Sequence, residues 1–334
     1  MKKLHIMILP LIISGGANVQ TPTLSTNFDI IGGNLPAIRH MIDMKVCGDT
    51  LLFTYEGEDG HGQRLLRRAV IDCKNNTLAV SPDMGKRNDG YYASYMPYPF
   101  IADDSTIRIV SQDDCDIYTI ENDTAFVRSK QYLMTGNNTV PFPISQYVQD
   151  VFMTAPDNYV FIGREPKGGR QYAMKADLTT AKIDTIRQIN ISPELQSWMP
   201  NAGELAYSGK HCRLAFAYKF HPAIEIFGLD GSAIKMIKIC DDTFDPKTLC
   251  NADFEMYNPV HFADISTTAD FIYALYKGVE DNDADKSIIY QIDWNGNIFR
   301  AYFLTADLQN IAAYNNDLLI GWDGKRFIIV TPQI

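Results

Sequence analysis

The sequence predicts an all-β protein, a single six-bladed β-propeller built from four-stranded antiparallel blades. A polar turn followed at once by a β-rich apolar run occurs six times, as at Asp104-Ser105 and Asn316-Asp317. These turns recur roughly every 50 residues, close to the period of one propeller blade. The second turn residues lie at positions 50, 105, 158, 211, 270 and 317. Repetition over the whole chain indicates one toroid and leaves no linker for a second domain.

The fifth repeat shows the four strands of a blade most clearly. Its strand-like runs occupy residues 260–267, 271–276, 287–294 and 298–304. Asn295-Gly296 lies between the last two runs, and Asn-Gly is among the strongest short hairpin signals. Continuous apolar runs such as 271–276 are typical of strands covered on both faces. The third and fourth repeats show the same order of strands and turns, so we expect equivalent blades there.

The sixth repeat is one strand short. Its strand-like runs at 310–315, 318–322 and 326–332 have no fourth member after them, whereas residues 24–31 form a strand-like run without a neighbouring partner. We therefore predict that 24–31 completes the last blade. Such closure of the ring removes two exposed sheet edges that would otherwise invite aggregation.

Two stretches of the fifth repeat resemble a known family. FADISTTADFIYALY at 262–276 and SIIYQIDWNGN at 287–297 look like the bacterial TolB-like six-bladed propellers, and the pattern of strands and turns extends this resemblance over residues 20–334. The resemblance implies a propeller fold and an exported protein. It implies no activity or catalytic residue, because the family has no general assigned activity.

The N-terminal residues have the pattern of a signal peptide. Lys2 and Lys3 precede an apolar run at 4–13, and Gly15-x-Ala17 fits a signal-peptidase site. We therefore predict a signal peptide over 1–17 and one mature domain over 18–334, exported to the periplasm or cell surface. The alternative is a buried N-terminal strand of a cytoplasmic protein. TolB-like proteins are commonly lipid-anchored, but no cysteine follows this apolar run, and no other stretch is long enough to cross a membrane.

The net charge excludes some classes of binding partner, and the number of cysteines bears on whether the protein contains disulfides. A net charge of −10 would repel phosphate backbones, so nucleic acid and anionic membrane surfaces are not expected as general partners. We expect a monomer. Six cysteines permit disulfides in an exported protein, and Cys240–Cys250 is the favoured bridge. The alternative is that the cysteines are small buried strand residues.

Motifs for catalysis and cofactor binding are absent from the sequence. There is no GxSxG, HExxH or Walker motif, and the acidic loop at 280–285 fails the EF-hand pattern. We therefore predict no cofactor and no metal. One alternative is that His40 and His261, with carboxylates such as Glu204 and Asp264, hold a metal.

The propeller topology places one set of residues on a common face. Starts of the innermost strands converge around the mouth of the central channel, where aromatic rings and an arginine suit sugars or peptides. The predicted ligand-binding residues are Arg39, His40, Tyr91, Tyr147, Trp198, Asn258 and His261.

Two functions compete for this fold. The first is a non-catalytic binding or scaffold module that presents this face to a peptide, protein or glycan. The alternative is a lyase or hydrolase that acts in the channel with His40 or His261 as general base, an expectation based on fold analogy. Three or more ionisable side chains converging at the channel mouth favour the enzyme, whereas an apolar channel favours the scaffold.

Overall fold

Strands account for nearly all the regular structure in a computed structural model of the chain. It describes residues 23–24, 26–29, 31–33, 35–57, 63–72, 74–75, 77–86, 92–94, 96–101, 106–111, 117–121, 125–130, 149–165, 169–180, 182–242, 244–250, 257–278 and 287–331. The predicted signal peptide at 1–17 lies outside these residues. No helix among them is long and apolar enough to cross a membrane.

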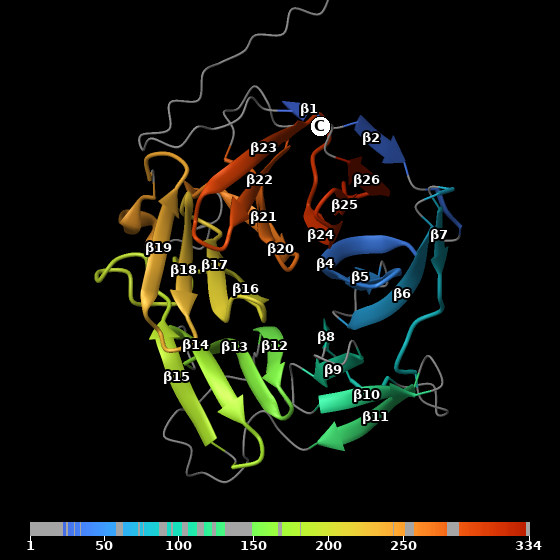
Figure 1. Ribbon diagram of the computed structural model, residues 1–334, viewed down its shortest axis with the longest axis horizontal. Coiled ribbons are helices and arrows are strands. Elements are labelled where there is room, and N and C mark those ends of the chain that lie inside the picture. Colours follow the sequence, from blue (N-terminus) through green and yellow to red (C-terminus); the bar gives the residue numbers. More distant parts are fainter. Residues whose placement is uncertain are drawn as a thin grey trace, which may run out of the picture.

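Six sheets stand radially around a central axis (Figure 1), which confirms the predicted six-bladed propeller. Blade 1 contains β4 (Ile38–Cys47), β5 (Thr50–Gly57), β6 (Arg64–Asp72) and β7 (Thr77–Val80). Blade 2 contains β8 (Pro97–Ile101), β9 (Ile107–Ser111), β10 (Ile117–Glu121) and β11 (Ala125–Lys130). Blade 3 contains β12 (Gln149–Ala155), β13 (Asn158–Arg164), β14 (Gln171–Asp177) and β15 (Lys182–Gln188). Neighbouring strands within each of these blades pair antiparallel.

Blades 4 to 6 repeat this order, and a short 3₁₀ helix, η1, lies between blades 4 and 5. Blade 4 contains β16 (Gly203–Ser208), β17 (Arg213–Tyr218), β18 (Ala223–Gly228) and β19 (Ala233–Lys238), and η1 spans Pro246–Cys250. Blade 5 contains β20 (Phe262–Thr267), β21 (Phe271–Tyr276), β22 (Ser287–Asp293) and β23 (Ile298–Leu304). Blade 6 contains β24 (Asn310–Asn315), β25 (Leu318–Trp322) and β26 (Phe327–Thr331). Blades 4 and 5 each contain four antiparallel strands in sequence order, whereas blade 6 has only three from this part of the chain.

The N-terminal segment closes the ring as predicted, and it does so with more than one strand. β2 (Thr26–Asp29) pairs antiparallel with β26 as the fourth strand of blade 6. On either side of it, β1 (Thr23–Leu24) pairs parallel with β23 of blade 5, and β3 (Ile31–Gly33) pairs parallel with β7 of blade 1. The segment therefore joins the outer edges of three consecutive blades.

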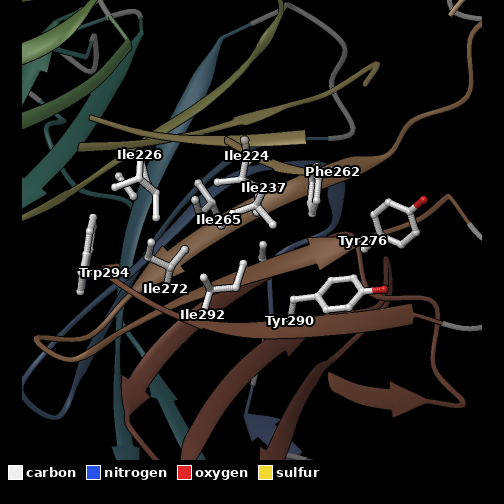
Figure 2. Close-up of a cluster of buried hydrophobic side chains, with 14 of the residues drawn as sticks. Ile224, Ile226, Ile237, Phe262, Ile265, Ile272, Tyr276, Tyr290, Ile292 and Trp294 are labelled. Carbon is white, nitrogen blue, oxygen red and sulfur yellow. The ribbon is translucent and has the colours of Figure 1, made fainter. Parts of the chain in front are cut away.

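The hydrophobic core lies between neighbouring blades. In the cluster between blades 4 and 5 (Figure 2), Ile224 and Ile226 of β18 face Ile272 and Ile292 of blade 5, and Trp294 lies at one end. Both faces of an inner strand are covered in this arrangement, which explains the continuous apolar runs in the sequence. Packing between blades therefore fixes the positions of the strand ends that carry the polar sites.

The predicted Cys240–Cys250 disulfide is wrong, because Cys240 is a free cysteine. Its Sγ lies 3.2 Å from the hydroxyl of Tyr276, at the end of β21 in the next blade. The short spacing between the two cysteines in the sequence suggested a bridge, but the packing of blade 4 against blade 5 directs Cys240 toward Tyr276.

Candidate functional site on the channel and the loop face

The innermost strands of blades 1 to 5 each contribute one polar side chain to a buried network in the channel. We call these residues the channel ring: Asp43, Tyr98, Asp150, Glu204 and Asp264. Each lies about seven residues before the turn residue that marks its repeat, as does Asn310 in blade 6. The repeat therefore places an equivalent position of every blade at the axis.

Lys45 joins the ring members of blades 1 to 3. Its ammonium group lies 2.8 Å from the carboxylate of Asp43 and donates a 2.8 Å hydrogen bond to the hydroxyl of Tyr98. That hydroxyl in turn donates to the carboxylate of Asp150 over 3.0 Å. Burial lowers the pKa of Lys45, but the surrounding carboxylates, Asp43 above all, outweigh it and the net shift is upward.

Glu204 and Asp264 form the ring's second half, a carboxyl pair that shares a hydrogen bond. Burial raises the pKa of Asp264 to about 7. Burial and the neighbouring carboxyl of Asp264 together raise the pKa of Glu204 well above its usual range. Burial also raises the pKa of Asp150 to about 6. Carboxyl groups that resist ionisation near neutral pH can exchange protons under mild conditions, a property of many catalytic sites and of some structural networks.

Among the described residues, no group of three or more His, Cys, Asp or Glu side chains is placed to hold a metal ion. His40 is exposed at the start of β4. His261 packs against Tyr276, with 5.8 Å between ring centroids and a 3.3 Å contact from Nδ1 to the tyrosine hydroxyl. The alternative in which these histidines join Glu204 and Asp264 around a metal therefore has no geometric support.

A second polar site lies on what we call the loop face, which carries the starts of the innermost strands and the loops between second and third strands. Arg164, the last residue of β13, places its guanidinium 4.2 Å from the ring centroid of Trp198. Its Nε donates to Gln171 Oε1 over 3.0 Å, and its Nη2 donates to Gln149 Oε1. We call these four residues the Arg–Trp site.

A buried asparagine fixes the loop that carries Trp198. Asn201 is fully buried, and its amide donates to the carbonyls of Leu195 and Ser197 over 2.6 and 2.7 Å while its Oδ1 accepts the N–H of Ile191. The backbone carbonyl of Asn201 accepts a hydrogen bond from Gln171, which also binds Arg164. The loop and the arginine are therefore held by one connected network.

His221 connects this loop with the next one. Its Nδ1 lies 2.7 Å from a carboxylate oxygen of Asp242, and its Nε2 lies 3.1 Å from the carbonyl of Pro200. Phe244 covers the imidazole, with 4.5 Å between ring centroids. Because the ring is only 1% exposed, His221 has a structural role that fixes two loops of the loop face relative to each other.

The predicted ligand-binding residues do not form one cluster. Arg39 and His40 are exposed on β4 of blade 1, whereas Trp198 belongs to the connection between blades 3 and 4, across the ring. Asn258 is fully buried and donates to Thr248 Oγ1 over 2.7 Å. His261 is 4% exposed, and its Nε2 has no hydrogen-bond partner among the described residues.

The other two predicted residues, Tyr91 and Tyr147, lie outside the described residues. Exposed apolar side chains on the described loop face are instead Met199, at 38%, and Tyr257, at 56%. Both belong to the connections that flank blade 4, and Met199 directly follows Trp198 of the Arg–Trp site. The described loop face is therefore most apolar around blade 4.

Sequence reasoning did not find Arg164 or most of the channel ring. Asp43, Tyr98 and Asp150 share their offset from the repeat turns with Glu204 and Asp264, and this regular offset could have identified them. Arg164 has no such signal. Its importance depends on Trp198 and Gln149, which are distant in the sequence and meet only through the packing of blade 3.

Comparison with known proteins supports the fold. The sequence matches no protein-family model and no curated protein. A member of the DUF4221 family from Bacteroides vulgatus aligns with a TM-score of 0.57 and 10% identity over 92% of this chain and 96% of its own. A candidate exported protein from Bacteroides fragilis aligns with a TM-score of 0.55 and 10% identity over 96% and 97%.

A third structure, a protein of unknown function from Bacteroides thetaiotaomicron, aligns with a TM-score of 0.53 and 12% identity over 93% of this chain and 76% of its own. Identities this low show a shared fold and carry no activity from one protein to another. The chain is thus similar to propellers that include a candidate exported protein, and its function has to be argued from its own residues.

Proposed function

We propose that this protein is an exported, monomeric binding module, akin to the TolB-like propellers, that presents its loop face to a glycan, peptide or protein. The observation that carries the proposal is the Arg–Trp site, with the exposed Met199 directly after Trp198. The exposed Tyr257 lies on the next connection of the loop face, after blade 4. Aromatic and arginine side chains dominate the energy of many binding surfaces. Here Arg164 ends strand β13, and Trp198 stands on a loop that the buried Asn201 and His221 hold in place, which lowers the cost of ordering it on binding.

The predicted residues take different parts in this proposal. Trp198 contacts the ligand directly, and Arg39 and His40 are exposed enough to contact a ligand that extends across the channel mouth. Asn258 and His261 are buried, so they support the loop face from beneath. Tyr91 and Tyr147 stay predicted contacts.

Array binding with matched variants tests the proposal. Purified wild type, Trp198→Ala and Val70→Ala are applied to an array of glycans and peptides. Val70 is the control because it is 52% exposed and lies on β6, away from the loop face. We expect at least one array ligand to bind wild type and Val70→Ala, and to bind Trp198→Ala about tenfold more weakly or worse. Absence of any bound ligand, or equal binding by all three proteins, contradicts the proposal.

One observation favours the alternative, a lyase or hydrolase acting in the channel. The channel ring gathers four carboxyl groups and Lys45, and the raised pKa of Asp264, about 7, suits a group that takes up and releases protons near neutral pH. The base in this version is a carboxylate of the channel ring in place of the expected histidine. His261 packs against Tyr276 beneath the loop face, and His40 is exposed at the start of β4.

The alternative has its own test. A hydrolase or lyase of this kind loses at least about a hundredfold of its rate in Asp264→Asn and keeps it in Trp198→Ala. Any turnover of an array ligand, followed in these two variants, therefore separates the two functions. Turnover that is insensitive to Asp264→Asn contradicts catalysis in the channel.

A further inference from the structure

Arg164 is a half-buried cation that lacks an acidic partner among the described residues. Its hydrogen bonds go to the neutral amides of Gln149 and Gln171, and Trp198 lies against its guanidinium. No hydrogen bond to a described residue uses its Nη1 amino group. Burial lowers the pKa of Arg164, although the carboxylate of Asp150 partly opposes this shift.

Two other half-buried arginines of this protein, Arg67 and Arg187, are neutralised directly. Arg67 contacts Asp83 at 2.6 Å, and Arg187 contacts Glu225 at 2.5 Å. Taking a guanidinium out of water without a counter-ion has a free-energy cost, which is why such groups are ordinarily paired. Arg164 differs from Arg67 and Arg187 in this respect, because its hydrogen bonds to described residues go to neutral amides and burial lowers its pKa.

The nearest carboxylates are already occupied. Asp150 accepts the hydroxyl of Tyr98 with Oδ1 and the N–H of Leu205 with Oδ2. Glu165, the next residue after Arg164, accepts the hydroxyl of Tyr172 over 3.0 Å and the backbone N–H of Arg170 over 3.0 Å. Both carboxylates are therefore engaged elsewhere, and no described carboxylate is paired with Arg164.

We propose that the Arg–Trp site binds the carboxylate of an acidic sugar, a hexuronate unit of a glycan, with Arg164 as the anion anchor and the indole of Trp198 against the sugar ring. This inference rests on the proposed binding function and specifies its ligand. A guanidinium offers parallel N–H donors that match the two oxygens of a carboxylate. A protein with a net charge of −10 attracts such an anion only where a local cation is left unpaired.

The groups around the site favour a sugar over a peptide. Gln149, which is only part-buried, accepts a hydrogen bond from Arg164 through its Oε1, so its amide lies beside the guanidinium. An amide both donates and accepts hydrogen bonds, as a sugar hydroxyl does. A flat aromatic side chain such as Trp198 complements the apolar face of a pyranose ring.

Calorimetry with one chemical probe in two forms tests the inference. Tetragalacturonate and its fully methyl-esterified form share one sugar backbone, and esterification replaces each carboxylate by a neutral methyl ester. Wild type, Arg164→Gln, Arg164→Lys and Arg170→Gln are titrated with both. Arg170 is the matched control because it is an exposed arginine on the same loop, so that its replacement changes the net charge equally.

We expect wild type and Arg170→Gln to bind the free acid about tenfold more tightly than the ester, Arg164→Gln to lose this preference, and Arg164→Lys to keep only part of it. Equal binding of acid and ester by wild type overturns the inference while leaving the binding function standing. Failure of wild type to bind tetragalacturonate, or tighter binding of an acidic peptide of matched charge, overturns the sugar assignment. A folded Arg164→Gln protein, checked by its melting temperature, that keeps the preference overturns the role of Arg164.

Discussion

The carboxylate of Asp264, on the innermost strand of blade 5, accepts the backbone N–H of Ile311, on the innermost strand of blade 6, over 2.7 Å. Asp150 does the same for Leu205 between blades 3 and 4, also over 2.7 Å. Innermost strands of neighbouring blades are not joined by a sheet ladder, so these side chains satisfy backbone groups that would otherwise be buried without a partner. The channel ring thus joins the blades at the axis.

The channel ring makes the stability of the protein depend on pH. In the native state the pKa of Asp264 is raised to about 7, whereas an unfolded aspartate ionises near pH 4. Between these values the native state binds a proton that the unfolded chain does not, so the free energy of unfolding falls as the pH rises through this window. Urea unfolding should show a loss of about 1 kcal/mol or more between pH 5 and 8.

Asp264→Asn should make this pH profile shallower, because it removes one titrating carboxyl and keeps an oxygen for the N–H of Ile311. Burial also raises the pKa values of Asp150 and Glu204, so part of the pH dependence should remain. The control is Asp184→Asn, a part-exposed carboxylate paired with Lys182, which changes the charge equally and should leave the profile as in wild type. A wild-type stability that rises from pH 5 to 8 would contradict the predicted direction.

Removal of the closing segment should destabilise the whole ring. A chain that begins at Pro36 lacks β1, β2 and β3 and exposes the edge of β26. Whole domains are stable by about 5–15 kcal/mol, so loss of three strand pairings should lower the melting temperature strongly and promote aggregation. A chain that begins at Thr21 is the control and should melt like the chain from residue 18. Equal melting of all three chains would show that closure contributes nothing.

Gly231 should tolerate no side chain. Its φ is +83°, and a Cβ there would meet the backbone carbonyl oxygen of Ile186 in blade 3. Gly48 also has a positive φ, +56°, but open space surrounds its Cβ position. Gly48→Ala should therefore show the conformational cost alone, about 1 kcal/mol, whereas Gly231→Ala should cost clearly more. Denaturant unfolding of both variants measures the difference, and equal losses would mean that blades 3 and 4 adjust freely.

His221 should control the order of the loop face. Its replacement by alanine leaves the carbonyl of Pro200 and the carboxylate of Asp242 without their shared partner, at a cost of about 1–3 kcal/mol. We expect faster limited proteolysis in the connections around 200 and 242 than in wild type. His40→Ala is the control, since His40 is exposed at the start of β4. Unchanged proteolysis in His221→Ala would show that the loops are held by other contacts.

The sequence was sufficient to predict the propeller because the repeat is local. Each turn and each apolar run can be recognised within one blade, and covered strands such as Phe271–Tyr276 differ plainly from amphipathic ones. Closure by the N-terminal strand was also predictable, since a sixth blade with three strands requires a fourth. The parallel pairing of Ile31–Gly33 with β7 could not be predicted, because a strand of three residues is too short to show a periodic pattern.

The candidate site was only partly predictable. Topology places Trp198 on the loop face, but burial separates Asn258 and His261 from Arg39 and His40, and burial depends on packing between blades. The contact between Arg164 and Trp198 joins a strand end to a loop more than thirty residues later. Such a contact depends on the path of the loop, which Asn201 sets through hydrogen bonds to Leu195 and Ser197.

The pairing of β2 with β26 has a kinetic consequence. These strands lie near opposite ends of the chain, so the ring cannot close until both have been synthesised and brought together. Contacts at such long separation form slowly, because the entropy of closing the loop must be overcome before any contact stabilises it. Five complete blades can form earlier, and the last sheet then has an open edge. The interval before closure is when an unfinished ring is most exposed to edge-to-edge aggregation, and its length sets how far this protein depends on assistance during folding.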